Sequence, residues 1–341
     1  MTPDDFIMEA LPDDVVETIE ERDAYIRNLP PAGGGFEFVV ADLQKWLPGR
    51  HVRVAFLGGD SALHRDIEEA TRQITEVCNI TLDFGRNAET GEYRTWSESD
   101  FDYSAEIRVS FDRAGNFSLL GTDCIDPGVG LSTEATGGRP GQRSLNLGGF
   151  DVRRPANWQG TVRHEFMHAL AFHHAHQNLR GPCETAFRWE DDDGYQRTKN
   201  HSGVFVADAE GRRPGIYTYL SGAPNGWAKS KVDHNLRRRE DNDVIVGPFD
   251  RASIMLYRFP EMFYQVLPND CAPLGDGITL SDGDKRGLTL LYPKMSPEVA
   301  GIATGNEAML QAIKPLAEPL RGLETADTPM AQRVAAILRG R

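Results

Sequence analysis

The sequence predicts an α+β protein whose mixed, twisted sheet begins with a strand, a long crossover helix and a second strand. The stretch HVRVAFLGG (51–59) alternates valine and phenylalanine with other residues, as a strand does. The next segment carries an apolar stripe at spacings of three and four, which indicates a helix: Leu63, Ile67, Ala70, Ile74 and Val77. The strand pattern then returns in ITLDFG (80–85).

Shorter elements follow along the chain. AEIRVSFD (105–112) is typical of a third strand, and FSLLGTD and RSLNLGG predict two more short strands. The segment 180–250 is rich in Gly, Asp, Asn and Arg, which favours long loops and at most one short helix. Within 278–293 a helix is expected again, with Ser281 as its N-cap.

The two ends differ from this central part. Residues 1–45 begin with an acidic stretch of helical pattern, and prolines and glycines in LPPAGGGFEF (29–38) then predict a linker. Residues 295–341 predict helices. We therefore expect an N-terminal extension (1–45), one large domain (46–294) and a helical C-terminal extension (295–341).

Composition limits the class of function. The formal net charge of −14 argues against binding to nucleic acid or to an anionic membrane surface. No stretch approaches the roughly 20 apolar residues of a membrane span, and the acidic N-terminus lacks the pattern of a secretory signal. The four cysteines fit two disulfides in an oxidising compartment, and they also fit four buried thiols. We expect a secreted protein, which corresponds to the first case, and keep a cytoplasmic protein, which corresponds to the second, as the alternative. The cysteines are Cys78, Cys124, Cys183 and Cys271.

Five of the nine histidines lie in HEFMHALAFHHAH (164–176). Positions four apart share one face of a helix, so His164 and His168 can place two ring nitrogens on one metal ion. Glu165 lies beside them, within reach of a water on that ion. A catalytic zinc keeps three protein ligands and leaves one position for water, whose proton a glutamate can take.

The longer pattern H-E-x-x-H-x-x-G-x-x-H places a third ligand ten residues after the first, at His174. His173 and His176 are its competitors, and we expect both to face solvent or to pack beside a ligand. The pattern has a glycine at the seventh residue, because the chain turns back there with a positive φ. This chain has Ala171 instead, at a cost of about 1 kcal/mol or a little more.

With SIMLY (253–257), the chain resembles the astacin family of metzincin zinc peptidases. In metzincins a methionine in a tight turn, the Met-turn, lies beneath the zinc histidines, and Met255 matches it. The astacin tyrosine two residues later matches Tyr257. Two positions depart from the family: Leu256 replaces a histidine, and Ala175 replaces the glutamate that usually follows the third ligand. The resemblance covers about residues 46–293.

This resemblance implies a zincin-like metzincin fold and a zinc-dependent endopeptidase that acts on protein or peptide substrates. It implies one catalytic Zn²⁺ held by His164, His168 and His174, with Glu165 as general base. Tyr257 would be a displaceable ligand that steadies the oxyanion. Substrate is expected to pair with an edge strand, for which RSLNLGG is the candidate. The N-terminal extension is then a candidate pro-like segment.

Three alternatives remain open. A gluzincin would take its third ligand from a later helix, where Glu184 and Glu190 are the candidates, although neither lies in a convincing helical pattern. A catalytically inactive zincin would act as a binding protein, yet it would have no need of Glu165. A purely structural zinc usually has four closed protein ligands, whereas the histidines supply three.

Overall fold

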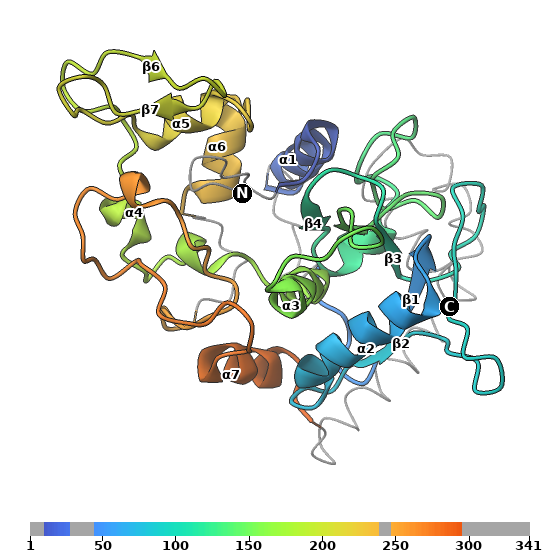
Figure 1. Ribbon diagram of the computed structural model, residues 1–341. Coiled ribbons are helices and arrows are strands. Elements are labelled where there is room, and N and C mark those ends of the chain that lie inside the picture. The colour runs from blue at the N-terminus through green and yellow to red at the C-terminus, as the bar shows by residue number, and fades with distance from the viewer. Residues whose placement is uncertain (1–9, 28–43, 239–246, 295–341) are drawn as a thin grey trace, which may run out of the picture. The chain divides into compact units, whose positions relative to one another are not determined.

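The computed structural model describes residues 10–27, 44–238 and 247–294. The chain divides into two compact units. Of the described residues, the sheet unit comprises 11–27, 44–172 and 278–294, and the loop unit comprises Ala10, 173–238 and 247–277 (Figure 1). The predicted C-terminal extension and the predicted linker lie outside the described residues.

The sheet unit is built on a five-stranded sheet in the order β2-β1-β3-β5-β4. Its strands are β1 (His51–Leu57), β2 (Thr81–Asp83), β3 (Ile107–Ser110), β4 (Asn116–Ser118) and β5 (Leu145–Leu147). The first three and β5 run parallel, whereas β4 pairs antiparallel with β5. The predicted α+β class with a mixed sheet is confirmed, and each predicted strand is present.

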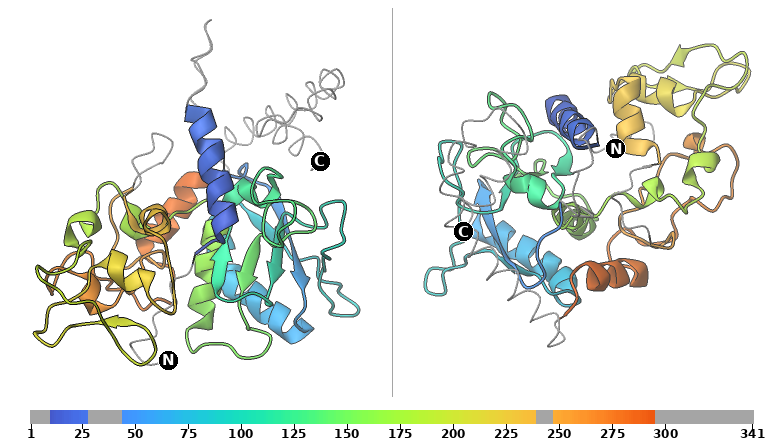
Figure 2. Two further views of the ribbon diagram at one scale, coloured as in Figure 1. Left: turned by 90° about the horizontal axis from the view of Figure 1, so that it is seen from above. Right: turned by 180° about the vertical axis from the view of Figure 1, so that it is seen from behind.

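Helices lie beside the strands of this sheet (Figure 2). The crossover helix α2 (Ser61–Thr75) begins where the Asp60 carboxylate accepts a hydrogen bond from the Leu63 amide at 2.8 Å. It packs against α3, which also lies against β4 and β5. The other helices of this unit are α1 (Asp13–Arg27), η1 (Gly121–Ile125), α3 (Trp158–Ala169) and α7 (Asp282–Leu291). No helix in the described ranges is long and apolar enough to cross a membrane.

Ser281 caps α7 as expected. Its hydroxyl accepts from the Asp284 amide at 2.9 Å, and the Asp284 carboxylate accepts from the Ser281 amide at 3.0 Å. This reciprocal capping box satisfies two amides that a helix N-terminus leaves without partners.

The edge of the sheet differs from the expectation. RSLNLGG forms β5, which lies between β3 and β4, so its prediction as the edge strand is wrong. Within β5, Asn146 is buried and accepts a hydrogen bond from the Ser110 hydroxyl at 2.8 Å. Its amide also donates to the Arg113 and Gly115 carbonyls. The outer strand on this side is β4.

The helix α1 packs into the sheet unit, and it confirms the helical pattern predicted near the N-terminus. Arg22 is buried, and its guanidinium lies 2.6 Å from an Asp123 oxygen and 3.4 Å from an Asp126 oxygen. The Thr18 hydroxyl accepts from the Gly130 amide at 2.8 Å. The apolar side chains that α1 buries are Val15, Val16 and Ile19.

The loop unit holds more regular structure than predicted. The described part of 180–250 contains three short α-helices and a hairpin, so the expectation of at most one helix is wrong. The elements are η2 (Ala175–Gln177), α4 (Cys183–Ala186), β6 (Thr198–Lys199), β7 (Phe205–Val206), α5 (Ile216–Ser221), α6 (Lys229–Leu236) and η3 (Glu261–Phe263). Each helix is too short to show periodicity, and their apolar residues meet in a shared core.

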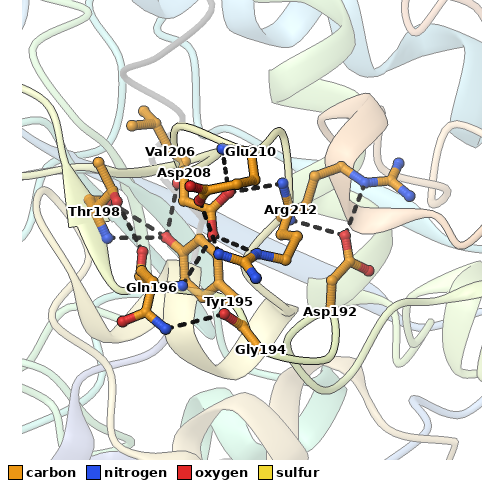
Figure 3. Close-up of polar contacts among 10 residues, drawn as sticks. Asp192, Gly194, Tyr195, Gln196, Thr198, Val206, Asp208, Glu210 and Arg212 are labelled. Atoms are coloured by element: carbon orange, nitrogen blue, oxygen red, sulfur yellow. Dashed lines mark hydrogen bonds and ion pairs between the residues drawn. The ribbon is translucent and has the colours of Figure 1, made fainter.

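Aspartates and arginines between residues 192 and 213 of the loop unit form a network of ion pairs and hydrogen bonds (Figure 3). The Asp208 carboxylate accepts from the Gln196 amide at 3.0 Å and from Arg212 Nε at 2.8 Å. Burial acts to raise the pKa of Asp208, but these hydrogen bonds prevail and lower it to about 2. Asp192 accepts from the Arg213 amide at 2.8 Å and pairs with Arg188. Protein donors therefore engage both carboxylates.

The cysteines match neither expected pattern. Cys183 and Cys271 form a disulfide with their Cα atoms 4.9 Å apart, whereas Cys78 and Cys124 are buried free thiols. The bonded pair is separated by 88 residues, so only the tertiary fold brings the two cysteines within bonding distance. Burial raises the pKa of both thiols, that of Cys124 to about 12, which disfavours a nucleophilic role.

Candidate metal centre

The helix α3 carries three of the predicted site residues. His164, Glu165 and His168 are all buried, and the Nε2 atoms of the two histidines lie 3.1 Å apart. The four-residue spacing therefore places both rings on one face, as predicted. Arg163 fastens this helix by donating to the Ala70 carbonyl at 2.9 Å and to the Ile278 carbonyl at 2.5 Å.

A backbone carbonyl fixes the orientation of His168. Its Nδ1 lies 2.6 Å from the Phe172 carbonyl oxygen. A carbonyl only accepts, so Nδ1 carries the proton and Nε2 keeps its lone pair for a metal ion. The aim of this ring therefore depends on the turn that follows the helix.

That turn has the conformation predicted for it. Ala171 has a φ of 68°, and it is the only non-glycine residue with positive φ in the described part of the chain. The Phe172 amide donates to the Met167 carbonyl at 3.0 Å, and the Ala171 amide donates to the His168 carbonyl at 2.8 Å. These two bonds are those of a Schellman motif, in which glycine usually occupies the position of Ala171.

Ala171→Gly is expected to stabilise the protein. Left-handed alanine costs about 1–2 kcal/mol, and glycine avoids this cost while giving the unfolded chain more freedom. We expect a net gain of about 0.5–1 kcal/mol, measured as a higher denaturant midpoint. Ala62→Gly on α2 is the control, and it should lower stability because Ala62 lies in a helix. Lower stability in Ala171→Gly would contradict the strain at this turn.

The loop unit places Tyr257 beside His174. Their ring centroids are 4.4 Å apart. The Ala175 amide donates to the Met255 carbonyl at 2.8 Å, which ties the residue after His174 to the SIMLY segment. Within that segment the Leu256 amide donates to the Ser253 carbonyl at 3.1 Å, closing a turn. Leu256 packs into the apolar core of the loop unit.

Two competing ligands are engaged elsewhere. His176 is buried, and its Nε2 lies 2.9 Å from the Asn235 carbonyl oxygen. Its ring packs 5.1 Å from that of His174, which fits a residue that supports a ligand. Glu184 pairs with Arg237 and also accepts from the Arg238 amide at 3.1 Å, which argues against Glu184 as the third ligand of a gluzincin.

His164, His168 and His174 form a group that could hold a metal ion. Each offers one ring nitrogen, and these atoms lie within 4.8 Å of one another. Zinc–nitrogen bonds are about 2.0–2.1 Å long, so the 3.1 Å between the His164 and His168 nitrogens fits one shared ion. Neutral imidazole suits zinc as well as copper, iron and nickel.

Sequence reasoning missed two residues next to this group. Trp46 Nε1 donates to the Ala169 carbonyl at 2.7 Å, and the Tyr292 hydroxyl donates to the Leu170 carbonyl at 2.9 Å. The only available signal was their position at the two borders of the predicted large domain.

The fold is similar to that of myroilysin. One structure of that protein matches 75% of this chain and 98% of its own, with 24% sequence identity and a TM-score of 0.51. A crystal structure of myroilysin matches 74% and 87%, with 23% identity and a TM-score of 0.43. High choriolytic enzyme 1, a hatching enzyme zinc-protease from the medaka fish Oryzias latipes, matches 72% and 90%, with 18% identity and a TM-score of 0.39.

No protein-family model and no curated protein matches the chain. The likeness to the first of these structures bears on the fold, and the predicted astacin-like metzincin fold is confirmed.

Proposed function

We propose that this chain is a zinc-dependent endopeptidase of the astacin-like metzincin type. The observation that carries the proposal is the group formed by His164, His168 and His174, with Glu165 buried on the same helix as two of them. The catalytic domain would span 46–294. A structural zinc would use a closed set of four ligands, whereas three imidazoles leave a position open for water.

Glu165 would act as the general base. When bound, zinc would polarise the scissile carbonyl and lower the pKa of a water. Glu165 would take the proton of that water and return it to the leaving amine. Its place next to His164 in sequence would put the carboxylate beside the metal ligands without making it one.

The substrate backbone would pair with β4. This strand is the outer strand of the sheet beside β5 and lies against α3, so its outer edge is the candidate to pair with an extended peptide. We also propose a secreted location, which the disulfide between Cys183 and Cys271 supports.

Metal content with and without His174 tests the proposal. Purified protein should carry about one zinc per chain and should lose peptide cleavage when a chelator removes the metal. His174→Ala should lose most of the zinc, whereas the matched control His173→Ala should keep it. Full zinc in His174→Ala would exclude this ligand set. Full zinc without cleavage of a broad peptide library would favour a binding protein.

Tyr257→Phe is expected to lower kcat by about 10²-fold or more, because one oxyanion donor is typically worth that much. The phenol would donate to the oxyanion only in the transition state, so KM should change less than kcat. Zinc content and thermal stability should stay near the wild-type values, since the ring beside His174 remains. Wild-type kcat in this variant would show that Tyr257 is a packing residue. Tyr195→Phe, which removes a hydroxyl that bonds to the Val206 carbonyl, is the control.

A further inference from the structure

We propose that Trp46 and Tyr292 are positioning residues of the metal centre, because their side chains hold the left-handed turn at Ala171. The part of this inference that names zinc rests on the proposed function. The part that concerns the turn stands on the contacts of the sheet unit alone.

Both side chains satisfy carbonyls that a helix C-terminus leaves without partners. The Schellman bonds use the carbonyls of Met167 and His168. The next two carbonyls, of Ala169 and Leu170, accept from Trp46 and Tyr292 instead. All four of these residues are buried, so the two donors take the place that water has at an exposed helix end.

Two other segments of the sheet unit lie close to the turn. A Cβ added at Gly121 would lie 1.7 Å from the Gln44 carbonyl oxygen and 3.0 Å from the Ala171 Cβ, so the segment before Trp46 passes close to the turn. The Thr122 amide donates to the same Gln44 carbonyl at 2.7 Å and fixes this segment.

The second segment is α7, where a Cβ added at Gly287 would lie 2.9 Å from the Phe172 ring. These two neighbouring segments and the two side-chain donors together hold Ala171 at a positive φ, which alanine disfavours.

The conformation at Ala171 also sets the orientation of the His168 ring. The Phe172 carbonyl, one residue after Ala171, accepts from His168 Nδ1 at 2.6 Å. If the turn relaxed, this carbonyl would move and the ring would lose the bond that sets its tautomer and direction. Trp46 and Tyr292 therefore act on the ligand through the backbone, from positions 123 and 122 residues away from the carbonyls that they cap.

Tyr292→Phe tests the inference by removing one oxygen. Zinc affinity, measured by competition with a chromophoric chelator, should fall about 10-fold, as it does when partners of metal ligands are lost. In the metal-free protein, amide hydrogen exchange at Ala171 and Phe172 should become faster. Tyr93→Phe is the matched control, because it removes another buried tyrosine hydroxyl of the sheet unit, which donates to Glu68 at 2.7 Å. It should leave zinc affinity and both amides unchanged.

A second pair of variants tests whether the strain matters. Glycine needs no help to hold a positive φ, so in an Ala171→Gly background Tyr292→Phe should weaken zinc binding by less than about 3-fold. Trp46→Phe removes the other donor and should reproduce the loss of affinity, so the inference stays testable if Tyr292→Phe does not fold.

Three results would overturn the inference: wild-type zinc affinity and amide protection in both single variants, an equal loss in Tyr93→Phe, or an undiminished loss in the glycine background. Wild-type protein that binds no zinc would contradict the proposed function instead. In that case the exchange of the Ala171 and Phe172 amides would still decide whether the two side chains hold the turn.

Discussion

Glu165→Gln is expected to lower kcat by about 10²- to 10⁴-fold, which is the usual contribution of a positioned general base. Glutamine has the size and shape of glutamate but cannot accept a proton at neutral pH. Glu165 lies on α3 between the two histidines of that helix, and it is 1% exposed. The substitution should therefore leave packing and zinc content unchanged.

Steady-state cleavage of a quenched fluorescent peptide, together with metal analysis of the same preparation, measures this effect. Glu69→Gln is the control, because Glu69 is exposed on α2 and pairs with Arg72 at the surface. Wild-type cleavage by Glu165→Gln would remove Glu165 from the mechanism. Loss of zinc along with activity would instead assign it to holding the metal centre together.

Arg22→Met is expected to destabilise the folded state by about 3–5 kcal/mol, the usual cost of breaking a buried ion pair on one side. The guanidinium and two of its carboxylate partners, Asp123 and Asp126, have side chains that are at most 3% exposed, and a third partner, Asp23, is 23% exposed. Methionine keeps the apolar stem of the arginine but removes the guanidinium that pairs with these two buried carboxylates. The change thus isolates the charge.

Denaturant unfolding measures the free energy, and Arg72→Met is the matched control. Arg72 pairs with Glu69 across one turn of α2, and both side chains are more than 60% exposed. Losing that pair should cost about 0–1 kcal/mol. Equal denaturant midpoints for the two variants would show that the Arg22 ion pairs of α1 contribute little to the free energy of unfolding. Residues 1–45 would then remain a candidate for a removable pro-like segment.

Much of the fold was predictable because its elements are locally encoded. The stripe on α2 and the alternation in β1 are each complete within fewer than 20 residues, so periodicity alone identifies them. The short helices α4, α5 and α6 were missed for the converse reason. They span 4, 6 and 8 residues, too few to show a helical period.

The residues of the candidate site also separate into those that local sequence patterns predict and those that only the folded structure reveals. By itself, the sequence determined the spacing of His164, His168 and His174, the glutamate beside the first of them and the alanine at the turn. These are short-range patterns, and helix geometry converts them directly into positions in space.

Only the tertiary structure decided which strand is the outer one, which cysteines pair, where Arg22 docks and what caps the end of α3. Each of these depends on contacts between residues that are far apart along the chain, such as Trp46 with Ala169 and Cys183 with Cys271. A local pattern fixes the direction of a side chain relative to its own helix or strand. The partner that it meets is set by how distant segments pack, and no period in a single sequence records that packing.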